Sequence, residues 1–189
     1  MLLIVGAVLG LAAGLLTGGS LTNVVTRRLR WPLVVIAAFV VKELEFRSPL
    51  GTSGLAPAAF VVSLLVLIAW TVWQRHELPG ILLVTIGMSL NLTATLANGG
   101  RMPVAAAAAH LGPSQLQEQG SWAQYVVMGA GARLGWLGDW IFVPAPLDRL
   151  FPQAYSPGDL VSMVGLTAVL FLLTRPRRAP AAQEAITTR

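Results

Sequence analysis

The sequence predicts an all-α fold, a polytopic α-helical membrane protein with about five transmembrane helices. Of the 189 residues, 55% are hydrophobic and only 11% are charged, and the mean hydropathy is +0.70. A soluble domain carries roughly 25% charged residues, so this chain has too few charges to cover a water-facing surface. A helix satisfies its own backbone polar groups in lipid, and we therefore expect each long apolar run to be helical.

Five apolar runs are the expected spans of a single transmembrane domain, residues 1–174. They cover about residues 1–19, 31–46, 55–73, 81–97 and 159–174. Residues 98–158 are rich in Pro and Gly, which predicts an external loop region with short interfacial or re-entrant helices. At this point it stays open whether 121–138 also crosses. Residues 175–189 have the composition of a basic, disordered tail.

Arginines cluster after the first and the last apolar run. They are Arg27, Arg28, Arg30, Arg175, Arg177 and Arg178. Cytoplasmic loops carry an excess of Lys and Arg, so we expect a multi-pass protein of the inner cell membrane with its N-terminus outside and its C-terminus in the cytoplasm. We expect these arginines to meet anionic lipid. This explains the net charge of +5, and we expect no nucleic-acid partner.

The composition argues against several kinds of chemistry. The chain has no Cys, which excludes thiol nucleophiles, disulfides and Cys-ligated metals. Its two histidines, His76 and His110, are too far apart in the sequence to indicate a metal site. We therefore expect no metal and no cofactor.

The fourth apolar run carries two asparagines, Asn91 and Asn98. They are seven residues apart and therefore lie on one face of a helix. Polar side chains in hydrocarbon tend to face other helices. The pair is compatible with interhelical hydrogen bonds, or with a polar stripe that leads to a site at the helix end.

The stretch NGGRMPV, residues 98–104, directly follows this run. Gly99 is a natural residue for ending a helix, and Pro103 cannot continue one. These roles leave Arg101 unexplained. Backbone N–H groups at the glycines can bind an oxyanion, and an Arg can bind two oxygens of the same group. In that case Asn98 and Arg101 would orient a substrate. Arg101 can equally meet a lipid phosphate, which we favour.

Asp139 and Asp159 each follow a Gly, twenty residues apart. Ser156, Pro157 and Asp159 fit a capping box, with Ser at the N-cap and an acid at N3. Alternatively, the Pro-rich stretch between the two acids can fold back and bring the carboxylates together. Two carboxylates about 3 Å apart cannot both ionise, so one would act as acid and the other as base in a hydrolase.

Two resemblances follow from these motifs. The combination of NGGRMPV, Leu137-Gly-Asp139 and Ser156-Pro-Gly-Asp159 resembles an uncharacterised bacterial family of integral membrane proteins. This resemblance implies a membrane fold and says nothing about an activity, because the function of that family is unknown. Residues 130–165 also remotely resemble lipoprotein signal peptidase, a small polytopic aspartyl protease. That resemblance implies a catalytic role for Asp139 and Asp159. Trp136 and Trp140 stand where that family has Asn and Arg. The chain can therefore also share the scaffold of that family and use it for another function.

Three functions are therefore compatible with the sequence. The first is a structural or partner-binding membrane component, for which a membrane-protein partner is expected. The second is a membrane-embedded hydrolase with Asp139 and Asp159 as its acid and base, acting on a lipid-linked or membrane-peptide substrate at the outer leaflet. The third is a small transporter or channel component with Asn91 and Asn98 in its path. We favour the first.

Overall fold

The chain is mostly helical, as predicted. The computed structural model describes residues 2–27, 29–47, 53–111, 114–144, 146–150 and 153–176. Its α-helices are α1 (Leu2–Leu16), α2 (Leu21–Val25), α3 (Leu33–Arg47), α4 (Ala56–Trp73), α5 (Ile81–Ala97), α6 (Ser114–Gln119) and α7 (Pro157–Leu173). Short 3-10 helices are η2 (Gln74–His76), η3 (Ala106–Leu111), η4 (Gly135–Leu137) and η5 (Leu147–Arg149). Each of the five predicted apolar runs matches one of the long helices, α1, α3, α4, α5 and α7, although α3 ends one residue after its run and α7 begins two residues before its run.

Residues 101–155 contain the predicted short helices, but they also contain strands, which the all-α prediction lacked. The strands are β1 (Met102–Val104), β2 (Ser121–Trp122), β3 (Tyr125–Val127), β4 (Ile141–Phe142) and β5 (Ala154–Tyr155). β3 lies between β1, to which it is parallel, and β2, to which it is antiparallel, while β4 and β5 form a separate antiparallel pair. We call residues 101–155 the strand lobe. The segment 121–138, for which the sequence left a crossing open, holds β2, β3 and η4.

The strands have a physical reason. Valines and aromatic residues, which favour extended backbone, occupy short stretches of the strand lobe between glycines and prolines. These stretches are too short and too interrupted for a stable helix. Their backbone N–H and C=O groups pair between strands instead.

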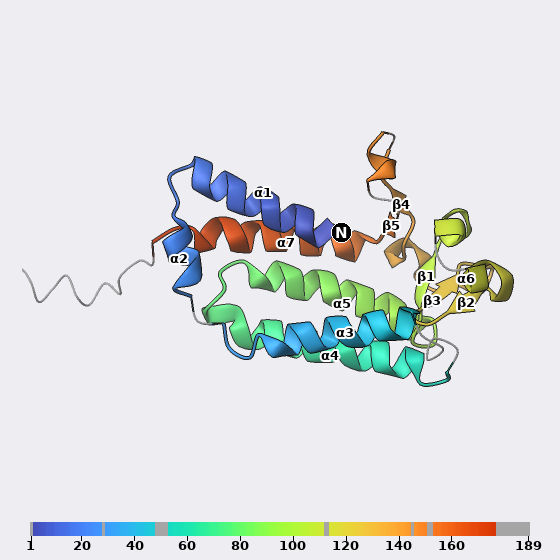
Figure 1. The fold of residues 1–189 in the computed structure, drawn as a ribbon. Helices are drawn as coiled ribbons and strands as arrows, with labels where there is room; N and C mark the ends of the chain where they lie inside the picture. The colour runs from blue at the N-terminus through green and yellow to red at the C-terminus, as the bar shows by residue number, and fades with distance from the viewer. Residues whose placement is uncertain are drawn as a thin grey trace, which may run out of the picture.

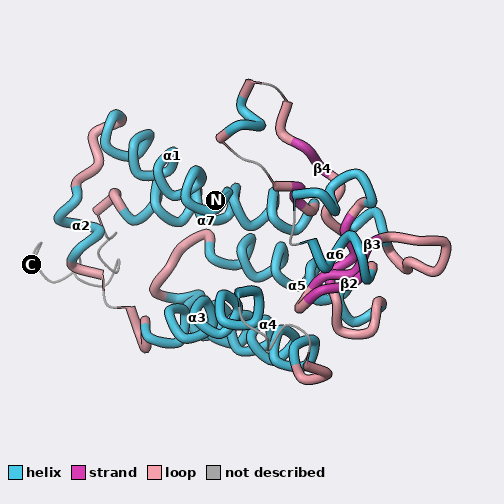
Figure 2. The backbone as a smooth tube through the Cα atoms, turned by 45° about the vertical axis from the view of Figure 1, so that its right-hand side comes forward, coloured by secondary structure: helices cyan, strands magenta, loops and turns pink. Residues whose placement is uncertain are grey.

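The five long helices lie side by side, with the strand lobe at one end and α2 at the other (Figures 1 and 2). Contacts join them in the order α1, α7, α5, α4, α3. The last helix of the chain therefore lies between the first and the fourth of the long helices, and α7 joins the two ends of the sequence.

Close approach of backbones holds α7 in this place. The buried residues of α1 are Gly6, Gly10 and Gly14. A Cβ added at Gly6 would lie 2.7 Å from the carbonyl oxygen of Met163, which real atoms do not tolerate. The Thr167 hydroxyl donates to the Gly6 carbonyl oxygen at 3.0 Å. Small residues permit this distance between helices, and a methyl group would not fit.

The same rule applies on the other side of α7. A Cβ at Gly165 of α7 would lie 2.6 Å from the backbone nitrogen of Val84 on α5. A Cβ at Gly87 of α5 would overlap the backbone and side chain of α7, at Gly158 and Ser162. Both neighbours of α7 therefore contact it through glycine.

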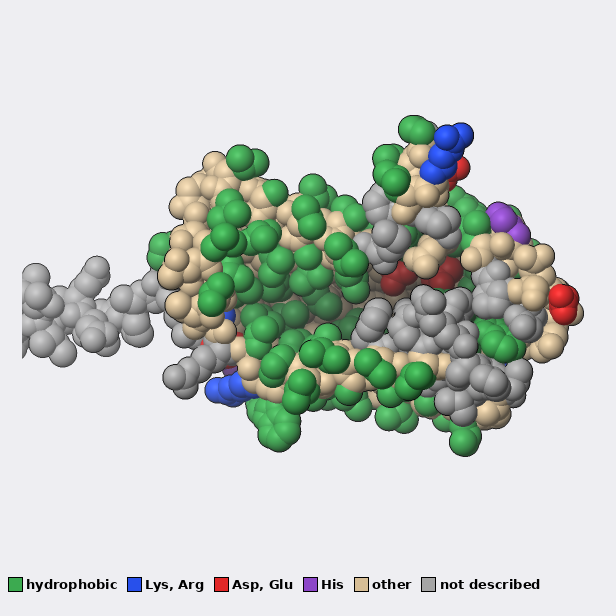
Figure 3. Space-filling model, in the orientation of Figure 1, with side chains coloured by type: hydrophobic (Ala, Val, Ile, Leu, Met, Phe, Trp, Pro, Cys, Tyr) green, Lys and Arg blue, Asp and Glu red, His purple; other side chains and the backbone are tan. Residues whose placement is uncertain are grey.

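Large apolar side chains lie on the outside of the helices. Ile4, Val8 and Leu16 of α1 are 65%, 59% and 87% exposed, while its glycines are buried. Figure 3 shows hydrophobic side chains over much of the helical region on the face in view. On α1 this distribution is the reverse of the one that water imposes on a soluble protein, whereas Leu78, Ile81, Val169 and Leu173 form a buried apolar cluster beside α5 and α7.

Helix length fits a membrane crossing in one place. Among the described residues, the segment Ala56–His76 alone is long and apolar enough to cross, with a mean hydropathy of 2.1. The apolar helices α1, α5 and α7 have 15, 17 and 17 residues. A helix of that size is roughly 25 Å long, against about 30 Å of hydrocarbon. The five-span arrangement therefore stays a prediction.

The glycine contact between α1 and α7 yields a stability prediction. We expect Gly10→Val to lower the free energy of unfolding by about 2 kcal/mol, because its side chain would overlap the backbone of Thr167. Denaturant unfolding in detergent, followed by Trp fluorescence, measures this change. The control is Ala12→Val on the exposed face of α1, for which we expect a change within about 0.5 kcal/mol. Equal effects of the two substitutions would contradict the packing argument.

Candidate functional site

The pairing of β4 with β5 brings the segments of the two predicted aspartates together. Ile141 of β4 pairs with Tyr155 of β5, and the Trp140 N–H donates to the Tyr155 carbonyl oxygen at 3.2 Å. Because the two strands are antiparallel, the start of β4 lies beside the end of β5. Asp139, just before β4, and Asp159, just after β5, therefore follow from the same end of the strand pair. In the space-filling view, acidic side chains lie recessed in a hollow between the helices and the strand lobe (Figure 3).

Asp159 forms the capping box that the sequence predicts. Its backbone N–H donates to the Ser156 hydroxyl at 2.9 Å, and its Oδ2 accepts from the Ser156 N–H at 3.1 Å. This satisfies two donors at the start of α7 and places a negative charge at the positive end of the helix dipole.

The same carboxylate also contacts α5. Asp159 Oδ1 accepts a hydrogen bond from Asn91 Nδ2 at 2.9 Å, and the Ser156 hydroxyl donates to Asn91 Oδ1 at 2.8 Å. Asn91 thus makes the interhelical hydrogen bond that the sequence allowed. We call Asn91, Ser156 and Asp159 the capping network, in which each residue forms hydrogen bonds with both others.

Asp139 is fixed by its backbone. Its N–H donates to the Pro103 carbonyl oxygen at 2.8 Å, and its own carbonyl oxygen accepts from Ala105 N–H at 2.9 Å. The residue is 8% exposed. The preceding Gly138 lies against β1, where a Cβ would come 2.9 Å from the Pro103 ring. Glycine therefore permits the close approach that seats Asp139 beside β1.

Tyr155, which the sequence reasoning missed, lies on the strand between the two acids. It is 5% exposed, and its hydroxyl has no hydrogen-bond partner in the part of the chain that the structure describes. Burial raises the pKa of Tyr155 above its ordinary value of 10.0, and the charge of Asp159 raises it further. At neutral pH the phenol is therefore protonated and can donate a hydrogen bond or a proton. An aromatic residue directly before the capping box was its signal in the sequence.

Asn98 and Arg101 serve other places. Asn98 ends α5, and its side chain donates to Arg133 O at 2.6 Å and accepts from Arg133 N at 2.9 Å. It therefore attaches the turn around Arg133 to the helix end. Arg101 Nε donates to the Ala123 carbonyl oxygen at 3.2 Å. The two asparagines of the predicted stripe thus hold different elements, Asn91 holding α7 and Asn98 the strand lobe.

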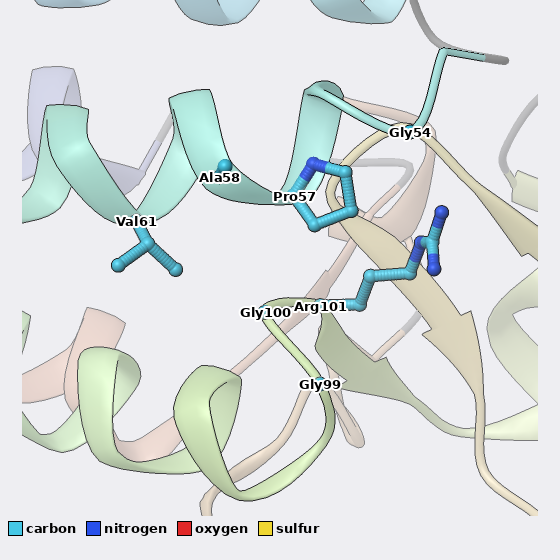
Figure 4. Close-up of a pocket in the computed structure, with 7 residues that line it drawn as sticks. All are labelled: Gly54, Pro57, Ala58, Val61, Gly99, Gly100 and Arg101. Carbon is cyan, nitrogen blue, oxygen red and sulfur yellow. The ribbon is translucent and has the colours of Figure 1, made fainter.

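Arg101 also lines a groove between the start of α4 and the end of α5. The groove has a volume of about 430 Å³ and is open to the surface. Figure 4 shows its lining residues, Gly54, Pro57, Ala58, Val61, Gly99, Gly100 and Arg101. Gly99 has the left-handed backbone conformation, φ +68°, expected of a residue that ends a helix.

The described arginines of the two basic clusters lie at the opposite end of the helices. Arg30 lies 4.0 Å from Glu77 and over the ring of Trp73, and Arg175 donates to Thr17 O at 2.8 Å. These contacts join helix ends, and contact with anionic lipid stays a prediction. Arg28, Arg177 and Arg178 lie outside the described residues. Across the described ranges, no three side chains of His, Asp or Glu gather as a metal site.

The capping network yields a second stability prediction. We expect Asn91→Ala to cost about 2 kcal/mol, because it leaves a partly buried carboxylate oxygen of Asp159 and the hydroxyl of the buried Ser156 without their partner. Thr93→Ala on the exposed face of the same helix is the matched control, and we expect less than about 0.5 kcal/mol. Denaturant titration of both purified variants compares them. A loss for Asn91→Ala no larger than that of the control would rule out an energetic role for the network.

Comparison with known proteins gives a family and no activity. A model of a family of unknown function, DUF5317, matches residues 26–171. No curated protein and no solved structure matches the chain. The resemblance to lipoprotein signal peptidase therefore stays a prediction, whereas the expectation of an uncharacterised family is confirmed. Since the match covers most of its length, the chain belongs to the DUF5317 family of unknown function.

Proposed function

We propose that the chain is an integral membrane protein, a structural or partner-binding component whose long helices lie in lipid. One observation carries this proposal: many large apolar side chains of the helices lie outside, while glycines and hydroxyl or amide side chains lie at the close contacts of α7 with α1 and α5. Water would drive the large apolar groups inward, whereas lipid solvates them as well as a protein core does.

The contacts between helices are of the kind that works in lipid. Hydrocarbon gives no hydrophobic driving force between helices, so close packing and hydrogen bonds must hold them together. The glycines along α7 supply the first. The second comes from the capping network and from Thr85, whose hydroxyl donates to the Thr71 hydroxyl at 2.9 Å between α5 and α4.

The short helices are compatible with this proposal. A bilayer thins locally around a short hydrophobic segment, at a cost of fractions of a kcal/mol per Å. Trp70 and Trp73 end α4 beside Arg30, an arrangement typical of the interface between lipid and water. The Arg-rich end would face the cytoplasm, which leaves the strand lobe and the N-terminus outside.

The strand lobe supplies the surface for a partner. Trp136, Trp140 and Phe142 are 64%, 46% and 45% exposed, and Leu150 of the same lobe is 62% exposed. Aromatic side chains are enriched at protein interfaces, and an exposed group of them indicates a contact.

The absence of Cys permits a direct test of this topology. We expect Gln119→Cys in the strand lobe to react with a membrane-impermeant maleimide in intact cells, and Leu29→Cys at the Arg-rich end to react only after permeabilisation. Val66→Cys, on the outer face of α4, should stay unlabelled in native membranes, because lipid excludes the reagent. Labelling in denaturant is the control that each thiol is present and reactive. Rapid labelling of Val66→Cys in membranes would overturn the proposal.

The strand pairing beside Asp139 and Asp159 favours a second candidate function. The pairing of β4 with β5, together with the protonated phenol of Tyr155 between them, favours a hydrolase in which Asp139 and Asp159 act as acid and base. The transport alternative gains no such support. Both polar atoms of the Asn91 side chain are engaged by Ser156 and Asp159, so we do not propose a path along it.

The hydrolase is tested by Asp139→Asn, Asp159→Asn and the double variant in cells that depend on the protein. If the two acids share one reaction, each single variant should lose about as much function as the double variant. Protein abundance in the membrane, measured alongside, separates lost chemistry from lost folding. The control is Asp148→Asn, an exposed acid of η5. Full function of both single variants would exclude the hydrolase.

A further inference from the structure

We propose that the groove beside Arg101 binds the phosphate of an anionic phospholipid, whose acyl chain lies along the outer face of α4. This inference rests on the proposed membrane location and names a lipid as a specific ligand. The groove lies where the strand lobe meets the helices, at the end of the bundle opposite the basic clusters (Figures 1 and 4). In a bilayer this position is the level of the headgroups.

The cation of the groove is held in place. Arg101 Nε donates to the Ala123 carbonyl oxygen, and among the described residues the two terminal nitrogens of its guanidinium form no hydrogen bond or ion pair. In Figure 4 the side chain extends along the groove toward Gly54. A guanidinium fixed at one nitrogen presents the other two as a fork, the geometry that fits two oxygens of a phosphate.

The backbone around the cation leaves room for a phosphate. Gly99 and Gly100 both have positive φ, and a Cβ at Gly99 would have open space around it. A Cβ at Gly100 would lie 3.0 Å from the Pro57 ring and narrow the groove. α4 has no side-chain cap at its start, so its positive dipole end also favours an anion there.

The remaining wall suits an acyl chain. Pro57, Ala58 and Val61 line the groove along α4. Beyond them on the same helix Val62 and Leu65 are 57% and 49% exposed, so the apolar surface continues away from the cation. α4 also begins the one segment of membrane-crossing length among the described residues. A phosphate at Arg101 followed by an apolar surface is the pattern of a phospholipid, and free phosphate would use the first part alone.

Native mass spectrometry of the full chain in neutral detergent tests the site. The probes are phosphatidylglycerol and phosphatidylcholine with identical acyl chains, and we expect the purified protein to prefer the anionic lipid. Arg101→Gln should weaken phosphatidylglycerol binding about tenfold, because it removes a charge-assisted bidentate contact. The control Arg149→Gln, an exposed arginine of η5, should leave binding unchanged. Equal loss in both variants would overturn the proposal in favour of general charge attraction.

A second variant tests the acyl wall and does not depend on the charge. Ala58→Trp should fill the groove and weaken lipid binding, whereas Ala69→Trp, also exposed on α4 but outside the groove, should not. Inorganic phosphate is the competitor. Displacement of the lipid by inorganic phosphate at the same concentration as the lipid would overturn the role of the acyl chain. If the thiol labelling shows a membrane protein but Arg101→Gln binds normally, the lipid site alone fails. If Val66→Cys is labelled in membranes, the proposed function fails first.

Discussion

The hydrogen bonds between Asn91 on α5 and the first turn of α7 fix the position of α7. Both the packing of the long helices and the position of the strand lobe depend on it. Ser156 and Asp159 set the residue at which α7 begins, and Asn91 sets where that beginning lies along α5. Once the start is fixed, Gly158 and Ser162 face Gly87, and Gly165 faces Val84. A shift of α7 by one residue would place side chains where only glycine fits, so the network and the glycines specify the same register.

The network also positions the strand lobe. β5 ends directly before Ser156, and β4 pairs with β5, so the place of α7 determines where Asp139 lies. The lobe is attached a second time at the end of α5, where Asn98 holds the turn around Arg133. A charge in a partly buried position is costly unless it is hydrogen-bonded, and the carboxylate of Asp159 receives two hydrogen bonds there. The capping role and a role in chemistry are compatible, because a carboxylate held by two hydrogen bonds is already oriented.

Local features of the sequence predicted local structure well. The apolar runs gave helices, Ser156 and Asp159 gave a capping box, and Gly99 gave a helix end, because each depends on neighbours within one or two turns. The strands were missed because their partners are distant in sequence: Met102 pairs with Tyr125, and Ile141 with Tyr155. The position of α7 between α1 and α5 could not be predicted either, since many glycines permit close packing and nothing local selects the partner helix. Tyr155 was missed for the same reason, since its burial depends on elements far along the chain.

The arginines at the two ends of the helices have different roles. Their contacts explain why the number of charges in a segment alone is a weak guide to the role of each arginine. Arg175 donates to Thr17 and lies over Phe171, so its charge is used to join the end of α7 to the end of α1. Arg30 similarly contacts Glu77 and Trp73. These arginines therefore stabilise helix ends, in addition to any role in setting the orientation of the protein in a membrane. Arg101 differs because, among the described residues, only its Nε forms a hydrogen bond. The arginine whose charge had no structural explanation from local sequence is therefore also the one that lines a groove.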